Sequence, residues 1–143
     1  MNDQLSPYLF VYSSLRKGFN NSNYEYITQY FDFVGECHAR GKLLEKVDHP
    51  VGVPTSDDFF IKGELYKMQE HVPFDYVMEQ LDDYEGLNTD MYQPEAMYRR
   101  ELVTVNHAGE NYEAWVYWYN GNTDEFPQLN ETDVLEYFKR RNG

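Results

Sequence analysis

The sequence predicts an α+β fold built on a strongly curved sheet. Runs of aromatic and branched residues typical of strands recur along the chain, and further segments carry apolar residues at helical spacing. Glycines interrupt otherwise extended segments, as they do at bulges and sharp bends of curved sheets. The chain has 143 residues without an internal repeat or a linker, so we expect one domain spanning residues 1–143.

The first half of the chain is predicted to hold strands around one short helix. Tyr8–Tyr12 is a continuous run of aromatic and branched residues, which favours a strand buried on both faces. Helical spacing of apolar residues over Tyr24–Phe31 indicates a short helix. Phe33–Val47 contains two glycines and is predicted to be a long bent strand or a hairpin. Asp48–Asp58, rich in proline, glycine and aspartate, is predicted to be a loop.

The second half is predicted to contain three more strands. Phe59–Met68 alternates apolar with charged residues, Glu64 among the charged ones, which indicates a half-buried strand. Tyr98–Val105 and Tyr112–Tyr119 are strand-like runs, and the turn-forming residues 106–111 between them predict a hairpin.

Two amphipathic helices complete the prediction. The first spans Pro73 to Glu85, because proline favours a first helical turn and Gly86 stands where a C-terminal cap belongs. The second spans Glu131 to Arg141 and is expected to bury Val134, Leu135 and Phe138.

Glu85 is out of place on the first of these helices. On a wheel of about 100° per residue it falls about 20° from Phe74, within the apolar arc. Burial and the negative end of the helix dipole both raise the pKa of such a carboxyl group, which makes Glu85 a candidate general base. The alternative is that the helix ends earlier and Glu85 forms a structural ion pair with Arg99 or Arg100.

Composition excludes several classes of partner. Twelve basic and 25 acidic residues give a net charge of −13 and a pI near 4.5, which disfavours binding to nucleic acid or to anionic membrane surfaces. No stretch has the length and apolarity of a membrane span or of a secretory signal. The single cysteine, Cys37, cannot form an internal disulfide and is expected to fill a small space in the core of a cytoplasmic protein. The four histidines are dispersed and match no metal-binding spacing.

Three groups of residues together resemble the gamma-glutamylcyclotransferase family, most closely its small single-domain branch that includes the gamma-glutamylamine cyclotransferases. The first is Leu9–Gly18, similar to the family's N-terminal strand and its Tyr-Gly-Ser/Thr-Leu loop. The second is Ala39–Leu44 together with Gly63–Tyr66, similar to the strands that follow. The third is Leu81–Gly86 followed by Tyr98–Arg100, similar to the end of the helix that carries the family's catalytic glutamate and to the succeeding strand.

The resemblance implies a compact mixed β-barrel with flanking helices. It also implies a reaction in which the α-amine of a small γ-glutamyl substrate attacks its own γ-carbonyl, giving 5-oxoproline and a free amine or amino acid. Glu85 matches the catalytic glutamate as general acid and base, and no metal or organic cofactor is required. The residues that match the substrate-binding loop are Tyr12, Ser13, Ser14 and Leu15.

Other interpretations remain open at this point. Ser13 stands where the family has glycine, which leaves room for a protein that binds a γ-glutamyl or other carboxylated ligand without converting it. The aromatic residues of Tyr112–Tyr119 are also compatible with a carbohydrate-binding module. Tyr98 and Tyr117 are expected either at the pocket or in the barrel core. Three basic residues either attract an anionic substrate or are ordinary surface charges: Arg16, Lys17 and Arg40.

Overall fold

The computed structural model describes residues 6–12, 29–46, 49–85 and 98–142. The strands are β1 (Tyr8–Val11), β2 (Phe31–Arg40), β3 (Lys42–Lys46), β4 (His49–Val53), β5 (Phe60–Met68), β6 (Tyr98–His107) and β7 (Glu110–Tyr119), and the helices are α2 (Phe74–Glu85) and α3 (Val134–Asn142). None of the helices in this part of the chain is long and apolar enough to cross a membrane.

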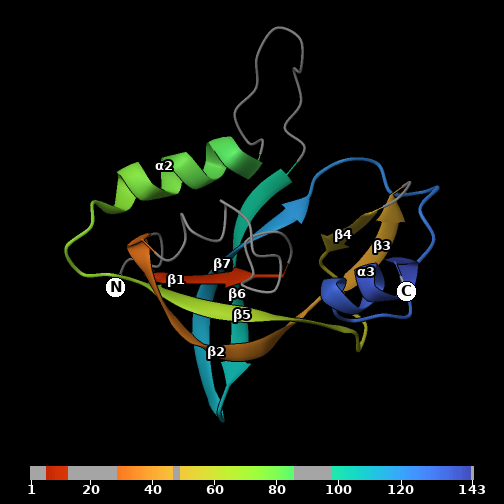
Figure 1. The fold of residues 1–143 in the computed structure, drawn as a ribbon, viewed down its shortest axis with the longest axis horizontal. Coiled ribbons are helices and arrows are strands. Elements are labelled where there is room, and N and C mark those ends of the chain that lie inside the picture. The colour runs from red at the N-terminus through yellow and green to blue at the C-terminus, as the bar shows by residue number, and fades with distance from the viewer. Residues whose placement is uncertain (1–5, 13–28, 47–48, 86–97, 143) are drawn as a thin grey trace, which may run out of the picture.

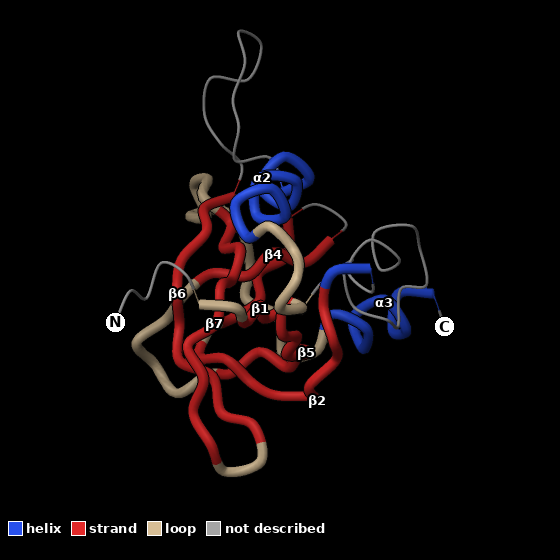
Figure 2. Tube along the Cα trace, turned by 90° about the vertical axis from the view of Figure 1, so that its left-hand side faces the viewer, coloured by secondary structure: helices blue, strands red, loops and turns tan. Residues whose placement is uncertain are grey.

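Five of the strands form a closed barrel in the order β1-β5-β2-β6-β7, and β3 pairs with β4 in a separate two-stranded sheet. Strands β1 and β7 are parallel, whereas the other barrel pairs are antiparallel. Figures 1 and 2 show α2 across one face of the barrel and α3 beside the small sheet. The α+β class, with a mixed β-barrel and flanking helices, is confirmed.

Strand β1 is buried on both faces, as its sequence predicts. Phe10 and Tyr12 lie in the barrel interior, in a cluster that includes Trp118. Leu9 and Val11 face the other way and pack against α2. A strand that separates two hydrophobic clusters needs apolar residues at every position, and this is the reason for the unbroken run.

Strand β2 contains the bulge that its glycines predict. Its register with β5 shifts between Phe33 and Gly35. The ring of His107 occupies the space that a side chain at Gly35 would need, 2.1 Å from an ideal Cβ. The predicted helix over Tyr24–Phe31 is wrong at its last residue, because β2 begins at Phe31, and residues 24–28 lie outside the described part of the chain.

The loop predicted for Asp48–Asp58 is wrong over its first part, where β4 forms. Val51, 1% exposed, pairs with Leu44 of β3, and Pro50 pairs with Glu45. In the sequence Pro50 indicates a loop, because proline has no backbone N–H group to donate to a neighbouring strand. In a two-stranded sheet one edge of each strand is unpaired, so the missing N–H group is tolerated.

The remaining elements largely follow the prediction. Strands β6 and β7 form a hairpin that extends further than predicted, because Ala108 and Gly109 turn the chain with φ values of 52° and 84°. Helix α2 has the predicted end at Glu85. Helix α3 begins at Val134 and not at Glu131, and the Asp133 carbonyl accepts the hydrogen bonds of its first turn.

Candidate active site

Tyr12 marks the beginning of the predicted substrate-binding loop. It follows β1 directly, is 5% exposed, and donates a hydrogen bond of 2.5 Å from its hydroxyl to the backbone carbonyl of Tyr117. Its ring lies 5.9 Å from the Trp118 ring between centroids. An ideal Cβ on Gly52 would lie 2.6 Å from the Tyr12 hydroxyl, so β4 approaches the tyrosine as closely as a glycine allows. The Tyr12 side chain therefore fixes the end of β1 and has its hydroxyl bonded to β7.

Helix α2, which carries the predicted catalytic residue, ends on the side of the barrel where β1 ends (Figure 1). Val77, Met78 and Leu81 are buried against the outer face of β1 and its neighbours, as the helical wheel predicts. Figure 1 shows α2 and β1 running in nearly the same direction, so that both elements end on one side of the barrel. Glu85 is the last residue of α2, and its backbone lies one helical turn after Leu81.

Ser13, Ser14 and Leu15 of the predicted site lie outside the described residues, as do Arg16 and Lys17, and Glu85 is described by its backbone. The roles of these residues stay predictions.

The two candidate tyrosines lie outside the barrel interior. Tyr117, 4% exposed, belongs to the cluster between the barrel and α2, on the same face as Val11. Tyr98 is half-buried on the same side and packs edge-on against Tyr119, with ring centroids 5.8 Å apart. Their position between the barrel and the helix corrects the alternative that placed them in the barrel core.

Arg40 belongs to a local surface network. Its Nη1 atom donates to the Asp57 carbonyl at 2.7 Å and lies 3.7 Å from the Asp58 carboxylate, and its guanidinium stands 5.0 Å from the centre of the Phe60 ring. The structure thus favours the interpretation of Arg40 as a surface charge.

Glu64 is a buried residue that sequence reasoning missed. The alternation in Phe59–Met68 assigned it to the polar side of a half-buried strand, yet it is 2% exposed. The Tyr66 hydroxyl donates a hydrogen bond of 2.9 Å to Glu64 Oε1. A signal was available, because Gly63–Tyr66 is one of the segments that carry the family resemblance.

Cys37 has the core position that the sequence predicts. It is 3% exposed and lies in the barrel cluster. Burial, and to a smaller extent the negative charge of Glu64, raise the pKa of its thiol to about 12. Among the described residues no group of three or more His, Cys, Asp or Glu side chains is arranged to hold a metal ion.

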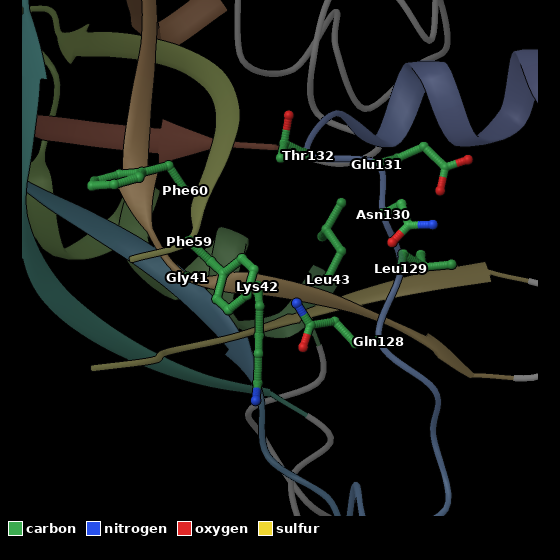
Figure 3. Close-up of a pocket in the computed structure, with 10 residues that line it drawn as sticks. All are labelled: Gly41, Lys42, Leu43, Phe59, Phe60, Gln128, Leu129, Asn130, Glu131 and Thr132. Atoms are coloured by element: carbon green, nitrogen blue, oxygen red, sulfur yellow. The ribbon is translucent and has the colours of Figure 1, made fainter. Parts of the chain in front are cut away.

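A small cavity of about 100 Å³ lies elsewhere, between the start of β3, the start of β5 and residues 128–132 (Figure 3). Lys42 and Gln128 lie beside it, and the Leu129 N–H donates to the Leu43 carbonyl at 2.9 Å along its wall. Neither Tyr12 nor α2 lines this cavity, so it is separate from the predicted site.

The aromatic alternation of β7 does not form a sugar-stacking surface. Val116 and Trp118 point into the barrel and are fully buried. Tyr117 and Tyr119, 4% and 8% exposed, are covered on the other face, and Tyr112 and Trp115 are half-buried against the two clusters. A carbohydrate-binding module would need such rings at the surface, and the structure therefore argues against that alternative.

Comparison with known proteins gives one family. The family model described as "Gamma-glutamyl cyclotransferase, AIG2-like" matches residues 9–137. The curated protein named "Putative gamma-glutamylcyclotransferase MJ1514", from Methanocaldococcus jannaschii, is 31% identical over 113 residues, which are 78% of this chain and 83% of that protein.

Solved structures show the same fold. YkqA from Bacillus subtilis superimposes with a TM-score of 0.68 at 22% identity over 95% of this chain, which spans 42% of YkqA. An AIG2-like protein from Mus musculus gives 0.66 at 20% identity, with 89% of this chain and 88% of that one covered. PH0828 from Pyrococcus horikoshii gives 0.63 at 21% identity, with coverages of 96% and 97%.

Proposed function

Because the chain belongs to the "Gamma-glutamyl cyclotransferase, AIG2-like" family, we propose that it converts a γ-glutamyl amine or a γ-glutamyl amino acid into 5-oxoproline and the free amine or amino acid. Glu85 acts as the general acid and base, and the loop that begins at Tyr12 binds the substrate. The chain's own residues are sufficient for this chemistry, so no cofactor is included in the proposal.

The arrangement of α2 on β1 is the observation that best supports this function. Leu81 belongs to the same hydrophobic cluster as Val11, so the last turns of α2 and the end of β1 share one packed layer outside the barrel. A five-membered ring closure depends mainly on orientation, because the nucleophile and the carbonyl belong to one molecule. Two packed elements that end on one side of the barrel (Figure 1) are suited to holding that molecule folded.

The proton transfers are assigned to Glu85. Its carboxylate takes a proton from the α-ammonium, and the neutral amine attacks the γ-carbonyl carbon. The new C–N bond closes the ring, and the original amide C–N bond then breaks. Glu85 returns the first proton to the leaving nitrogen, and the second proton that the attacking nitrogen loses ends on the released amine as an ammonium ion. The carboxylate is thus regenerated and no water is consumed.

Backbone N–H groups from Tyr12 to Leu15 are proposed to bind the substrate's α-carboxylate and the oxyanion that develops on the γ-carbonyl oxygen. The hydrogen bond from Tyr12 to β7 supports this role, since it fixes the first residue of the cradle. The small γ-glutamylamine cyclotransferases remain the branch that we propose for this chain, on the residues of the loop and of the helix end.

The test is release of 5-oxoproline, followed by mass spectrometry, from a panel of γ-glutamyl amines and γ-glutamyl dipeptides. Wild type is compared with Glu85→Gln and with Glu79→Gln, which changes an exposed glutamate of the same helix. We expect product from wild type and from Glu79→Gln and none from Glu85→Gln. Equal turnover by Glu85→Gln would refute the assignment of the base.

The second candidate function is binding without catalysis, which Ser13 in place of the family glycine favours. It predicts that folded wild type binds a γ-glutamyl compound by calorimetry and releases no 5-oxoproline from any panel member. In that case Ser13→Gly is the next variant to measure, and a gain of turnover would identify the loop as the cause.

A further inference from the structure

The proposed mechanism leaves the buried carboxylate of Glu64 unused. A carboxylate that is 2% exposed persists only where hydrogen bonds or nearby cations compensate for its lost hydration, and the Tyr66 hydroxyl provides one such bond. Buried acids next to a binding site are candidates for function, because their charge acts in surroundings that contain little water.

Glu64 lies close to the strand end that we assign to substrate binding. In the β1–β5 ladder it stands opposite Val11, the residue before Tyr12. Neighbouring strands are about 4.8 Å apart, so one strand spacing separates the backbone of Glu64 from that of Val11. Val11 and Tyr66 both belong to the cluster that α2 covers, and Glu64 lies between them on the same face of the barrel.

The charge of Glu64 reaches beyond its own strand. Cys37 lies in the barrel interior and stands opposite Gly63, the residue before Glu64. Burial is the larger cause of the raised pKa of the Cys37 thiol, and the negative charge of Glu64 is the second cause. A cation bound at the outer end of β1 would therefore be attracted by the same charge. The register neighbour on the other side, Glu36, is also acidic.

We propose that the buried Glu64 carboxylate makes the site selective for substrates that carry an α-ammonium group. The inference rests on the proposed function, in which that ammonium provides the attacking nitrogen. Because Glu64 is covered, it acts on the cation through space, and the hydrogen bond from Tyr66 holds it in position. Its effect is on binding of the charged substrate, since the attraction is lost once Glu85 has removed the proton.

The test compares ligands that differ by the α-amino group alone. Binding of γ-glutamyl-alanine and of glutaryl-alanine, and of the two n-butylamides, is measured by calorimetry in the Glu85→Gln protein, which cannot turn the ligands over. Adding Glu64→Gln removes the charge and keeps the shape of the side chain. We expect the preference for the γ-glutamyl ligands to fall about tenfold, with the glutaryl affinities unchanged.

Glu36→Gln is the matched control. Glu36 faces Glu64 across the β2–β5 ladder, but it is exposed and lies 3.8 Å from the Lys62 ammonium. Water and Lys62 screen its charge, so the ligand preference should stay as it is in the parent protein. In turnover assays with Glu85 restored, Glu64→Gln should raise KM about tenfold and change kcat/KM less than twofold, because the attraction is absent once the amine is neutral.

Several results would overturn the inference. An unchanged preference for the γ-glutamyl ligands in Glu64→Gln does so. An equal loss of affinity for both ligands of a pair also does so, because it indicates a purely structural role.

If Glu64→Gln does not fold, the pair Glu64→Asp and Glu64→Asn repeats the comparison, because these variants also differ in charge and not in shape. Wild type that neither binds nor converts any γ-glutamyl compound refutes the proposed function and this inference together, whereas active wild type with an unchanged preference refutes this inference alone.

Discussion

The hydroxyl of Tyr12 donates a hydrogen bond of 2.5 Å to the backbone carbonyl of Tyr117 and so links the end of β1 to β7. The parallel pairing of these strands covers Tyr8 and Leu9, opposite Ala114 and Trp115. Beyond that pairing the Tyr12 side chain joins the two strands. Tyr12 is also the first residue of the proposed substrate loop, so on the proposed function this bond contributes both to the stability of the fold and to the position of the loop's first residue.

Removing this hydroxyl should destabilise the protein. Tyr12→Phe removes the hydroxyl that donates to the buried Tyr117 carbonyl, and loss of this bond is expected to lower the free energy of unfolding in urea by about 1–3 kcal/mol. Tyr76→Phe removes a hydroxyl from a tyrosine that is 52% exposed and should change the free energy by less than about 0.5 kcal/mol. Equal unfolding midpoints for Tyr12→Phe and wild type would show that the bond contributes nothing.

Gly52 is required by the close approach of Tyr12. An alanine Cβ at this position would lie 2.6 Å from the Tyr12 hydroxyl, and we expect Gly52→Ala to cost about 1–3 kcal/mol of stability. In a Tyr12→Ala background the methyl group would enter an empty space, so the same substitution should cost less. Additive effects of the two substitutions in urea unfolding would contradict the contact.

Leu81 anchors the end of α2, because it is 1% exposed in the cluster that joins the helix to β1. Leu81→Ala is expected to destabilise the protein by about 2–5 kcal/mol, and Leu81→Met, which conserves volume, by less than about 1.5 kcal/mol. Thermal unfolding monitored by circular dichroism measures both. A similar loss for the two variants would mean that packing at this position is not what holds the helix.

Cys37 should make stability fall at high pH. Its thiol has a pKa of about 12 in the folded protein, against an ordinary value of 9.0. Above pH 9 the unfolded chain ionises at Cys37 while the folded protein stays protonated, so the unfolded state gains. From pH 8 to pH 10 the stability of wild type should drop by about 1.4 kcal/mol relative to Cys37→Ala. Parallel urea unfolding at the two pH values measures this difference, and a constant difference would contradict it.

Much of the fold could be predicted from the sequence because local patterns decided it. The unbroken apolar run of β1 and the period of Val77, Met78 and Leu81 reported directly which faces are buried. Strand β4 could not be predicted, since Pro50 looks like a loop residue until its partner strand β3 is known. Pairing between distant segments is the information that a local pattern lacks.

The candidate site residues were predicted from motifs, whereas the buried residues and hydrogen bonds around them could not be predicted. Glu85 and Tyr12 could be named because each stands in a segment that resembles a family. The burial of Glu64 could not be read from alternation, because the face of β5 that a half-buried strand would leave in water is itself packed, with Tyr66 and Met68 in the cluster that α2 covers. The bond from Tyr12 to Tyr117 joins residues 105 positions apart and has no sequence signature.

The central claim is that the substrate's own α-amine, and not water, breaks the γ-glutamyl bond. The most direct test uses a γ-glutamyl substrate labelled with ¹⁵N at the α-amine, converted in H₂¹⁸O and analysed by mass spectrometry. Cyclisation predicts 5-oxoproline that retains the ¹⁵N in its ring, contains no ¹⁸O, and appears in equal amount with the released amine. Glutamate that carries ¹⁸O in its γ-carboxylate would show hydrolysis instead and would contradict the proposed reaction.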